Sequence, residues 1–402
     1  MMRSRALLLP LPGAALVAGG AAALTFAAQT PPLEQAARGL PIPALVVAAL
    51  LAWRFRNARL FAATVVIAVA FVVLHARWLG ASGLAQTVIV TFLPVGLVLL
   101  ALKRDRGFTL RELRGSVIAA VAPATVAAFL SAGRSDAALR WLTHAYIHPA
   151  YTDWSALPQI ALFVIVVSLL VVALRALRRL NAGEAALFWV IIAAACAFVA
   201  PPDSTARGVW VVTSALVVIV ALVEIAYAFA FTDELTGLPG RRAFNYTISS
   251  LQPPYAIAVV DVDHFKTFND THGHEVGDQV LRMVAARLSR VGGGGVAYRS
   301  GGEEFTIIFE GANKRHAGEH AEAVRAAIAD ASFALRRTPR PRDKRGKEKR
   351  GRSGAARDVL RVTVSVGVAG ATDRSKTVHA VIEAADQAMY RAKTAGRNRV
   401  VA

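Results

Sequence analysis

The sequence predicts two parts of different fold class: an all-α polytopic transmembrane region over residues 1–231 and an α/β domain over residues 232–402. Of the 402 residues, 55% are hydrophobic, and the long apolar runs all lie in the first part. The second part alternates strand and helix patterns, which predicts a sheet covered by helices. A single cysteine, Cys196, excludes an intrachain disulfide framework and a thiolate metal cluster, and it suits a domain facing a reducing compartment.

Eight apolar segments in the first part approach the length of about 20 residues that crosses a bilayer as a helix. The first follows Arg3 and Arg5, so a cleaved signal peptide is the alternative there. The second is short and fits a re-entrant or interfacial segment as well. We therefore expect seven or eight spans. The segments are 6–28, 40–53, 60–77, 83–102, 115–133, 156–174, 184–200 and 209–231.

Basic residues in the connections predict the orientation of these spans. Lys and Arg concentrate on the cytoplasmic side of membrane proteins, and here every second connection is basic, with thirteen Lys and Arg against five in the others. Both ends of the region are therefore expected in the cytosol. The thirteen are Arg3, Arg5, Arg54, Arg56, Arg59, Lys103, Arg104, Arg106, Arg111, Arg114, Arg175, Arg178 and Arg179.

The spans contain few ionisable side chains, which disfavours a transporter. Glu224 and His75 fit satisfied positions near a membrane edge. The longest external connection, 134–159, carries four aromatic residues, which either anchor the membrane interface or form a ligand-sensing surface. These four are Trp141, Tyr146, Tyr151 and Trp154.

In the second part, six segments have clear patterns. Residues 254–263 are a short apolar run typical of a buried strand, and 296–310 form a hairpin. Glycine ends the last helix. The other expected elements are helices over 274–291, 319–331 and 379–396 and a strand over 359–370.

The hairpin contains the stretch YRSGGEEFTIIF, which raises a question about its acids. Gly301 and Gly302 fit a two-residue turn, because glycine accepts positive φ at no steric cost. Glu303 and Glu304 follow them directly. An ordinary acidic turn is one interpretation. The other is that the glycines let a phosphate group lie close to the backbone while the carboxylates bind a cation.

A second pair of acids favours the cation site. Asp261 and Asp263 are two residues apart at the end of the buried strand, so they are expected on one face of the sheet. Carboxylates there are costly unless they are hydrated or bind a cation. With Glu303 and Glu304 they form a set of oxygen ligands, which selects a hard cation such as Mg²⁺.

Four motifs in order, DELTGLPGRR, DVDHFKTFNDTHGHEVGD, RSGGEEF and AKTAGRNRV, resemble the GGDEF domain of diguanylate cyclases in its GGEEF form. The resemblance covers 232–402. It implies an α+β fold like that of nucleotide cyclases and polymerase palm domains, with a mostly antiparallel central sheet and surrounding helices. This replaces the doubly wound parallel sheet that the alternation alone would suggest.

The resemblance also implies a role for each matching residue. Asp261, Glu303 and the carbonyl of Val262 correspond to the magnesium ligands, with Mn²⁺ as the alternative ion. Glu303 is also the implied proton acceptor, supported by Glu304. The positions that bind substrate are Asn269 and Asp278 for the guanine base, His274 beside it, and Lys393, Arg397 and the main-chain amides near Phe265 and Lys266 for the phosphates.

The implied activity is the condensation of two GTP molecules into cyclic di-GMP with release of two pyrophosphates, by a homodimer in the bacterial inner membrane with its C-terminal domain in the cytosol. The alternative is a catalytically inactive GTP-binding signalling module of the same fold. Adenylate cyclase activity is disfavoured, because Asn269 and Asp278 fit guanine.

Two departures from the family pattern are local. Many members carry an inhibitory Arg-x-x-Asp product site before the hairpin, where this chain has Gly292–Gly295. We therefore expect no product feedback through that site. Gly240 replaces a common asparagine, and a local effect alone is expected.

The third departure is a basic insertion at about 336–358, whose core RRTPRPRDKRGKEKRGR (336–352) has ten Lys and Arg in seventeen residues. Such a run is most often a solvated, disordered loop. Contact with anionic lipid is the sharper alternative, because the domain would lie under a membrane. Nucleic acid is not expected as a partner: much of the net charge of +19 lies in this insertion and in short connections.

Overall fold

The computed structural model describes most of the chain, as two compact units, Met1–Tyr227 and Ala228–Ala402. Each unit is described by itself below. The basic segment 336–352 lies outside the described residues. Those residues are 11–27, 30–75, 83–103, 108–132, 135–152, 155, 157–179, 181–200, 204–331, 333–334, 359–371 and 377–402.

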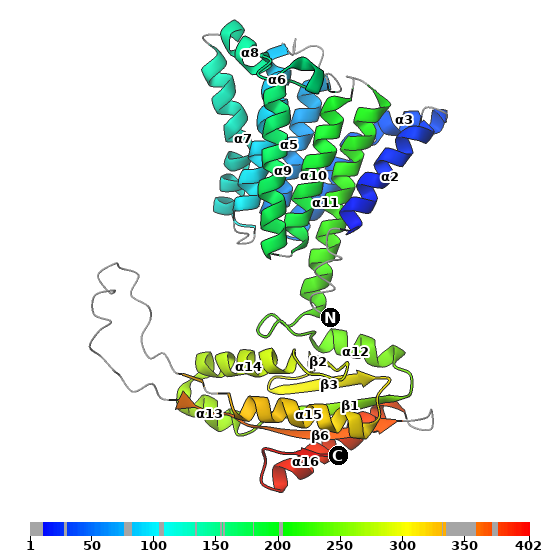
Figure 1. Ribbon diagram of the computed structural model, residues 1–402, viewed down its shortest axis with the longest axis vertical. Coiled ribbons are helices and arrows are strands. Elements are labelled where there is room, and N and C mark those ends of the chain that lie inside the picture. Colours follow the sequence, from blue (N-terminus) through cyan, green and yellow to red (C-terminus); the bar gives the residue numbers. More distant parts are fainter. Residues whose placement is uncertain are drawn as a thin grey trace, which may run out of the picture. The chain divides into compact units, whose positions relative to one another are not determined.

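The N-terminal unit is built from helices (Figure 1). Asn181 begins one of them by accepting a hydrogen bond from the Glu184 amide, which satisfies a free N–H of the first turn. The described helices are α2 (Leu11–Ala27), α3 (Pro31–Gly39), α4 (Pro41–Arg54), α5 (Ala58–His75), α6 (Gly83–Leu102), α7 (Leu110–Ala132), α8 (Ser135–Thr143), the 3₁₀ turn η2 (Pro149–Tyr151), α9 (Gln159–Arg179), α10 (Ala182–Val199) and α11 (Thr205–Phe231).

Three of the described helices are long and apolar enough to cross a membrane: Gln159–Arg178, Ala182–Val199 and Thr205–Phe231. Four further apolar helices are shorter than this criterion. The expected count of seven or eight spans is therefore not confirmed, although helices occupy every segment in which a span was expected.

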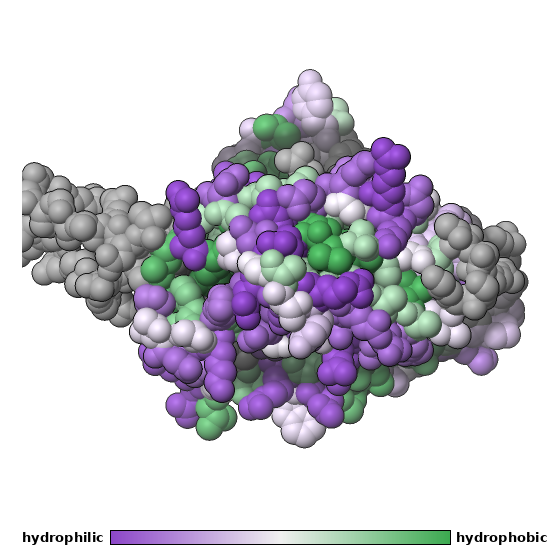
Figure 2. Space-filling model, turned by 90° about the horizontal axis from the view of Figure 1, so that it is seen from below, coloured by the Kyte–Doolittle hydropathy of each residue, from purple (hydrophilic) through white to green (hydrophobic). Residues whose placement is uncertain are grey.

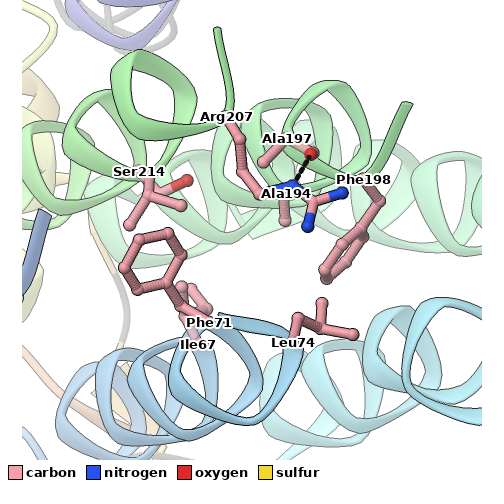
Figure 3. A pocket seen from close by; sticks show the side chains of 9 residues that line it. Ile67, Phe71, Leu74, Ala194, Ala197, Phe198, Arg207 and Ser214 are labelled. Atoms are coloured by element: carbon pink, nitrogen blue, oxygen red, sulfur yellow. Dashed lines mark hydrogen bonds between the residues drawn. The ribbon is translucent and has the colours of Figure 1, made fainter. Parts of the chain in front are cut away.

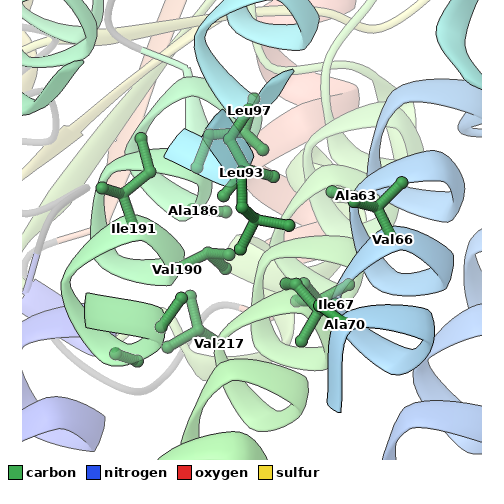
Figure 4. Close-up of a cluster of buried hydrophobic side chains, with 14 of the residues drawn as sticks. Ala63, Val66, Ile67, Ala70, Leu93, Leu97, Ala186, Val190, Ile191 and Val217 are labelled. Atoms are coloured by element: carbon green, nitrogen blue, oxygen red, sulfur yellow. The ribbon is translucent and has the colours of Figure 1, made fainter. Parts of the chain in front are cut away.

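Small side chains let the helices of this unit pack closely. Ala63, Ala70 and Ala186 lie between larger aliphatic residues such as Leu93 and Leu97 in one buried cluster (Figure 4). At Gly96 of α6 a Cβ atom would lie 2.1 Å from the carbonyl oxygen of Ala120 in α7, so any larger residue would push these two helices apart.

A buried ionic cluster joins four helices of this unit. The Glu184 carboxylate, at the start of α10, lies 3.0 Å from Arg175 of α9 and 3.5 Å from Arg59 of α5. Arg59 also donates to the carbonyl of Lys103, just after α6. Three of the basic connections therefore meet at one end of the helical unit, as their alternation predicts. The ion pairs that Glu184 makes with the basic residues of these connections were not predicted from the sequence.

The C-terminal unit has a five-stranded sheet of order β2-β3-β1-β6-β7. Three neighbouring pairs are antiparallel, whereas β6 and β7 are parallel, so the sheet is mixed: most of its pairs are antiparallel as expected, and the parallel pair was not predicted. The last residues return beside β6 after a helix, and such a crossover produces parallel pairing. The strands are β1 (Tyr255–Val262), β2 (Val296–Arg299), β3 (Glu304–Glu310), β6 (Val364–Ala371) and β7 (Val400–Val401), with β4 (Phe333–Ala334) and β5 (Val359–Leu360) in a separate pair.

Helices cover both faces of this sheet (Figure 1). Alternate residues of β1 point to opposite sides: Ala256, Ala258 and Val260 belong to one core cluster, and Tyr255 and Ile257 to the other. This explains why β1 is a continuous apolar run. The helices are α12 (Arg241–Ser250), α13 (Phe265–His272), α14 (His274–Leu288), α15 (Lys314–Ala329) and α16 (Val378–Thr394).

The surface of the C-terminal unit differs from its core. Figure 2 shows hydrophilic residues spread over one face of this unit, with hydrophobic residues in small separate patches. Five of the six expected elements are present, and the sixth, the strand over 359–370, is divided into β5 and β6, which belong to different sheets. The elements α12, α13, β4 and β7 were not predicted. One helix also begins earlier than expected, at Lys314, because the Asn313 side chain accepts a hydrogen bond from the His316 amide.

Candidate active site

Charged groups from three elements meet at the carboxyl end of β1. Asp261 is buried, with 4% of its surface exposed, and it lies opposite Glu304 in the pairing with β3. Glu303 immediately precedes that strand. The Nζ atom of Lys393, in the last turn of α16, lies 2.9 Å from Oδ2 of Asp261. The structure therefore brings together three of the residues that the sequence nominated.

The carboxyl groups at this point repel one another. Burial raises the pKa of Asp261, and repulsion from Asp263 and Asp386 adds to it, while the Lys393 ammonium opposes the change. Burial also raises the pKa of Glu303, followed by repulsion from Asp261 and then from Glu304. Asp261 and Glu303 are thus near enough for their charges to interact, and a cation would relieve their repulsion.

This donor set fits a hard divalent cation. It offers oxygen atoms alone, and two carboxylates held near each other at a buried edge gain from a positive charge. No three His, Cys, Asp or Glu side chains of the described residues gather into a metal-binding group. Main-chain oxygen, water or substrate phosphate would therefore have to complete the coordination, which is the usual situation for Mg²⁺.

The hairpin connection differs from the predicted two-residue turn. It spans Ser300 to Glu303 between β2 and β3, and neither Gly301 nor Gly302 has positive φ, so that prediction was wrong. A Cβ atom at Gly301 would lie 2.6 Å from the Glu304 carboxylate, whereas at Gly302 it would meet nothing within 4 Å. Gly301 is thus explained by a close approach, and Gly302 leaves the loop surface open.

Arg299 holds this connection in place. Its guanidinium donates to the carbonyl of Gly302 through Nη2 at 2.6 Å and Nε at 3.2 Å. The same group lies 2.9 Å from Oδ1 of Asp233, whose carboxylate also accepts from Thr236. The segment that follows α11 is therefore tied to the loop that carries Glu303. The contacts of Arg299 with Asp233 and Gly302 were not predicted from the sequence.

Asp263 serves structure rather than a cation site. Its carboxylate accepts hydrogen bonds from Thr363 and Ser365, both at 2.6 Å, and from the main-chain amide of Asn398 at 3.1 Å. Because β1 ends at Val262, Asp263 lies in the following turn. Asp263 therefore does not belong to the expected set of four acids that bind a cation. Its hydrogen bonds connect the end of β1 to β6 and to the C-terminal loop.

The two guanine-binding candidates lie at the junction of α13 and α14. The buried Oδ1 atom of Asn269 has no hydrogen-bond partner among the described residues. It lies where a Cβ atom of Gly277 would be only 1.8 Å away, so residue 277 must be glycine for Asn269 to adopt this position. Asp278 follows directly and is half-buried.

The phosphate-binding candidates lie in α13, in α16 and in the loop that follows α16. Phe265 and Lys266 begin α13, which has no side-chain cap at its N-terminus; the first amides of such a helix suit an anion. Arg397 lies in the loop after α16, next to Asn398, which Asp263 holds. His274 is exposed at the start of α14, and no described contact links it to the carboxylates.

Two glycines place the helices around the site. At Gly367 of β6 a Cβ atom would lie 2.0 Å from the amide nitrogen of Met389, so glycine lets α16 approach the sheet and carry Lys393 to Asp261. Gly240 precedes α12 without a side-chain cap, and its amide donates to the carbonyl of Phe231. A glycine at this N-cap position lacks the side-chain acceptor that an asparagine would offer to the first-turn amides.

The N-terminal unit contains a small, mostly apolar pocket (Figure 3). Ile67, Phe71 and Leu74 of α5 line one side, and Phe198 and Arg207 the other. Arg207 donates to the carbonyls of Ala197 and Ala200, where α10 ends. The guanidinium thus satisfies the free carbonyls of a helix end, which is a structural role.

Comparisons with known proteins concern the C-terminal part. A protein-family model described as "Diguanylate cyclase, GGDEF domain" matches residues 230–347 and 344–399, two pieces that meet inside the basic segment. The response regulator PleD of Caulobacter vibrioides is 34% identical over 180 residues, which are 43% of this chain and 36% of PleD. The diguanylate cyclase VdcA of Vibrio cholerae is 35% identical over 176 residues, 43% of this chain and 47% of VdcA.

Among solved structures, the GGDEF domain of DgcB from Caulobacter crescentus, in complex with c-di-GMP, is 33% identical with a TM-score of 0.35. The match covers 43% of this chain and 92% of that domain. The chain spans less than half the length of the two curated relatives.

Proposed function

The C-terminal unit belongs to the GGDEF domain family, and on that premise we propose that the chain is a membrane-bound diguanylate cyclase that converts two GTP molecules into cyclic di-GMP and two pyrophosphates. The observation that carries the proposal is the convergence of Asp261, Glu303 and Lys393 at one edge of the sheet. The 34–35% identity to the curated relatives supports it.

Each 3′-hydroxyl attacks the α-phosphate of the other GTP. A P–O bond forms, the bond to pyrophosphate breaks, and the hydroxyl proton is lost. Glu303 accepts this proton as the general base. Asp261, Glu303 and the Val262 carbonyl would hold Mg²⁺ or Mn²⁺, which would supply positive charge to stabilise the reaction.

The substrate is held by groups on both sides of this centre. Asn269 and Asp278 bind the guanine base, and the unpaired Oδ1 of Asn269 offers an acceptor for a guanine N–H. Lys393, Arg397 and the amides of Phe265 and Lys266 bind the phosphates, with His274 at the rim. Fixed cations offset the charge that develops on the departing pyrophosphate.

One domain holds one GTP, so two copies must face each other, and the working unit is a homodimer. The direct test is to incubate the detergent-solubilised chain with GTP and Mg²⁺. Cyclic di-GMP and pyrophosphate in a ratio of 1:2, with a rate per chain that falls on dilution, support the proposal. GTP binding without product would favour the inactive signalling module, and turnover of ATP alone would indicate another cyclase.

We also propose that the helical unit lies in the bacterial inner membrane with the ionic cluster of Glu184 at its cytosolic end. The three long apolar helices and the common position of three basic connections support this. Membrane-impermeant maleimide on whole cells, in a Cys196→Ser background, should label His148→Cys but not Arg56→Cys. The reverse pattern would overturn the orientation.

Two of the three departures from the family pattern, the Gly292–Gly295 run and the basic segment, have separate consequences. Without an Arg-x-x-Asp site at Gly292–Gly295, cyclic di-GMP added at micromolar concentration should leave the initial rate unchanged; inhibition would contradict this. For the basic segment 336–352 we propose contact with anionic lipid headgroups. Deleting it should weaken co-sedimentation with phosphatidylserine vesicles, and equal partitioning would exclude lipid contact.

A further inference from the structure

Two histidines on α15 lie against the glycine-rich turn that precedes β2. His316 and His320 are four residues apart, so they share one face of the helix. Their ring centroids are 4.6 Å apart with an interplanar angle of 76°. Within the described residues, no hydrogen bond to either imidazole is present. The proposed cyclase activity uses neither residue.

The Nε2 atoms of the two imidazoles lie beside Gly293. A Cβ atom built on this glycine would lie 2.6 Å from Nε2 of His320 and 2.8 Å from Nε2 of His316. The distance between the two Nε2 atoms is therefore at most the sum of their two distances from this Cβ position. Gly293 has a φ of +64°, a conformation that glycine adopts without strain, so the turn brings no side chain to this point.

Two histidines four residues apart on one face of a helix can chelate a borderline transition-metal cation through their nitrogens. Zn²⁺ binds histidine nitrogen at about 2.0–2.1 Å, and small side-chain rotations would bring both nitrogens to that distance. Imidazole is a preferred ligand of Zn²⁺, Cu²⁺ and Ni²⁺, whereas Mg²⁺ prefers oxygen. We propose that His316 and His320 bind a divalent cation of the Zn²⁺ class against the Gly292–Gly295 turn.

The proposed site is separate from the carboxylates at Asp261. In the β2–β3 pairing Val296 lies opposite Ile308, whereas Arg299 lies opposite Phe305. The turn at Gly293 thus adjoins one end of this hairpin, and Glu303 belongs to the other end. Because no third His, Cys, Asp or Glu completes a group among the described residues, water or main-chain oxygen would supply the remaining ligands.

The test measures metal binding rather than turnover. The solubilised chain is dialysed against micromolar Zn²⁺ in excess Mg²⁺, and bound zinc is counted by mass spectrometry. We expect His316→Gln and His320→Gln each to weaken one zinc site by at least about tenfold, and the double variant to lose it. The matched control is His379→Gln, which alters an exposed histidine of α16 and should retain the ion.

A second readout separates binding from folding. Zn²⁺ that binds the native state raises the thermal midpoint of the chain, so the rise should occur in the wild type and in His379→Gln but not in the double variant. Equal zinc content in the double variant and the wild type, or no zinc bound by the wild type, would overturn the proposal. The imidazoles would then be a packing contact on the glycine turn.

Discussion

The Lys393 ammonium and the Asp261 carboxylate form an ion pair of 2.9 Å between the end of α16 and the end of β1. This pair joins a residue proposed to bind phosphate with one proposed to bind metal. Because Asp261 is buried beside Glu303, the ammonium is the nearby charge that offsets the repulsion between the two carboxylates.

Lys393→Met should therefore impair the enzyme through electrostatics. Loss of the ammonium raises the pKa of Asp261 further and removes a cation from the phosphate site. We expect kcat/KM for GTP to fall by roughly 10²-fold, with the fold intact. Lys314→Met, at the exposed start of α15, is the control for general charge loss. An unchanged kcat/KM in Lys393→Met would remove this residue from the site.

Asp263→Asn should damage stability more than Asp261→Asn does. The Asp263 carboxylate accepts three hydrogen bonds, and its loss leaves donors unpaired at a cost of about 2–3 kcal/mol. Asp261→Asn instead removes a repelled buried charge, so the unfolding midpoint should stay or rise while activity is lost. Limited proteolysis of the C-terminal unit at increasing temperature measures the unfolding midpoint of each variant. Equal destabilisation by the two variants would contradict these separate roles.

Protons should compete with the divalent cation at Glu303. Without a bound cation the pKa of Glu303 is raised above its usual 4.5 by burial and then by repulsion from Asp261, so as pH falls through the raised value Glu303 gains a proton and binds the cation less well. The Mg²⁺ concentration that gives half the maximal rate should therefore rise on the acid side, and Glu304→Gln, which removes one of the charges that raise the pKa, should move this rise to lower pH. A Mg²⁺ requirement that does not change with pH would argue against Glu303 as the titrating group.

The raised pKa values of Asp261 and Glu303 also determine how the free energy of unfolding depends on pH. Between the usual and the raised pKa values, the folded chain binds more protons at Asp261 and Glu303 than the unfolded chain does. Stability from these groups therefore decreases as pH rises through that window. A bound divalent cation should reverse the loss, so added Mg²⁺ should raise the unfolding midpoint more at pH 7.5 than at pH 5.

Arg299 and Asp233 should act as one unit. Burial raises the pKa of Asp233, but hydrogen bonds from Thr236 and Arg299 outweigh it and lower the pKa below its usual 3.8. The stability that this adds is present above pH 3.8 and is lost as pH falls through the lowered value. Arg299→Met and Asp233→Asn should each destabilise the unit, with a coupling energy of about 1 kcal/mol in the double variant. If the two substitutions changed the free energy of unfolding additively, Arg299 and Asp233 would not be coupled.

Much of the fold could be predicted from local patterns. The apolar run of β1, the helical spacing of α14 and the charged connections of the N-terminal unit each have a direct physical signal. The parallel pairing of β7 and the cap at Asn313 depend on tertiary contacts, which no local pattern shows. The four-residue hairpin connection was missed because its geometry depends on Arg299, not on the preference of glycine for positive φ.

The candidate site was predictable in its chemistry but not in its full membership. Asp261 and Glu303 were nominated from motif and spacing, and the structure places them within electrostatic reach. Asp386 was not nominated, although it lies seven residues before Lys393 and hence on the same face of α16. The acceptor role of Asp263 could not be inferred, since Thr363, Ser365 and Asn398 are distant in sequence.

The most direct test of the account is the yield of cyclic di-GMP from GTP by Glu303→Gln, measured beside wild type and Glu310→Gln. Glu310 is an exposed glutamate at the other end of β3, so its variant matches the chemistry of the change. We expect Glu303→Gln to bind GTP yet lose product by at least about 10²-fold, with Glu310→Gln like wild type. Product at the wild-type rate from Glu303→Gln would contradict the account.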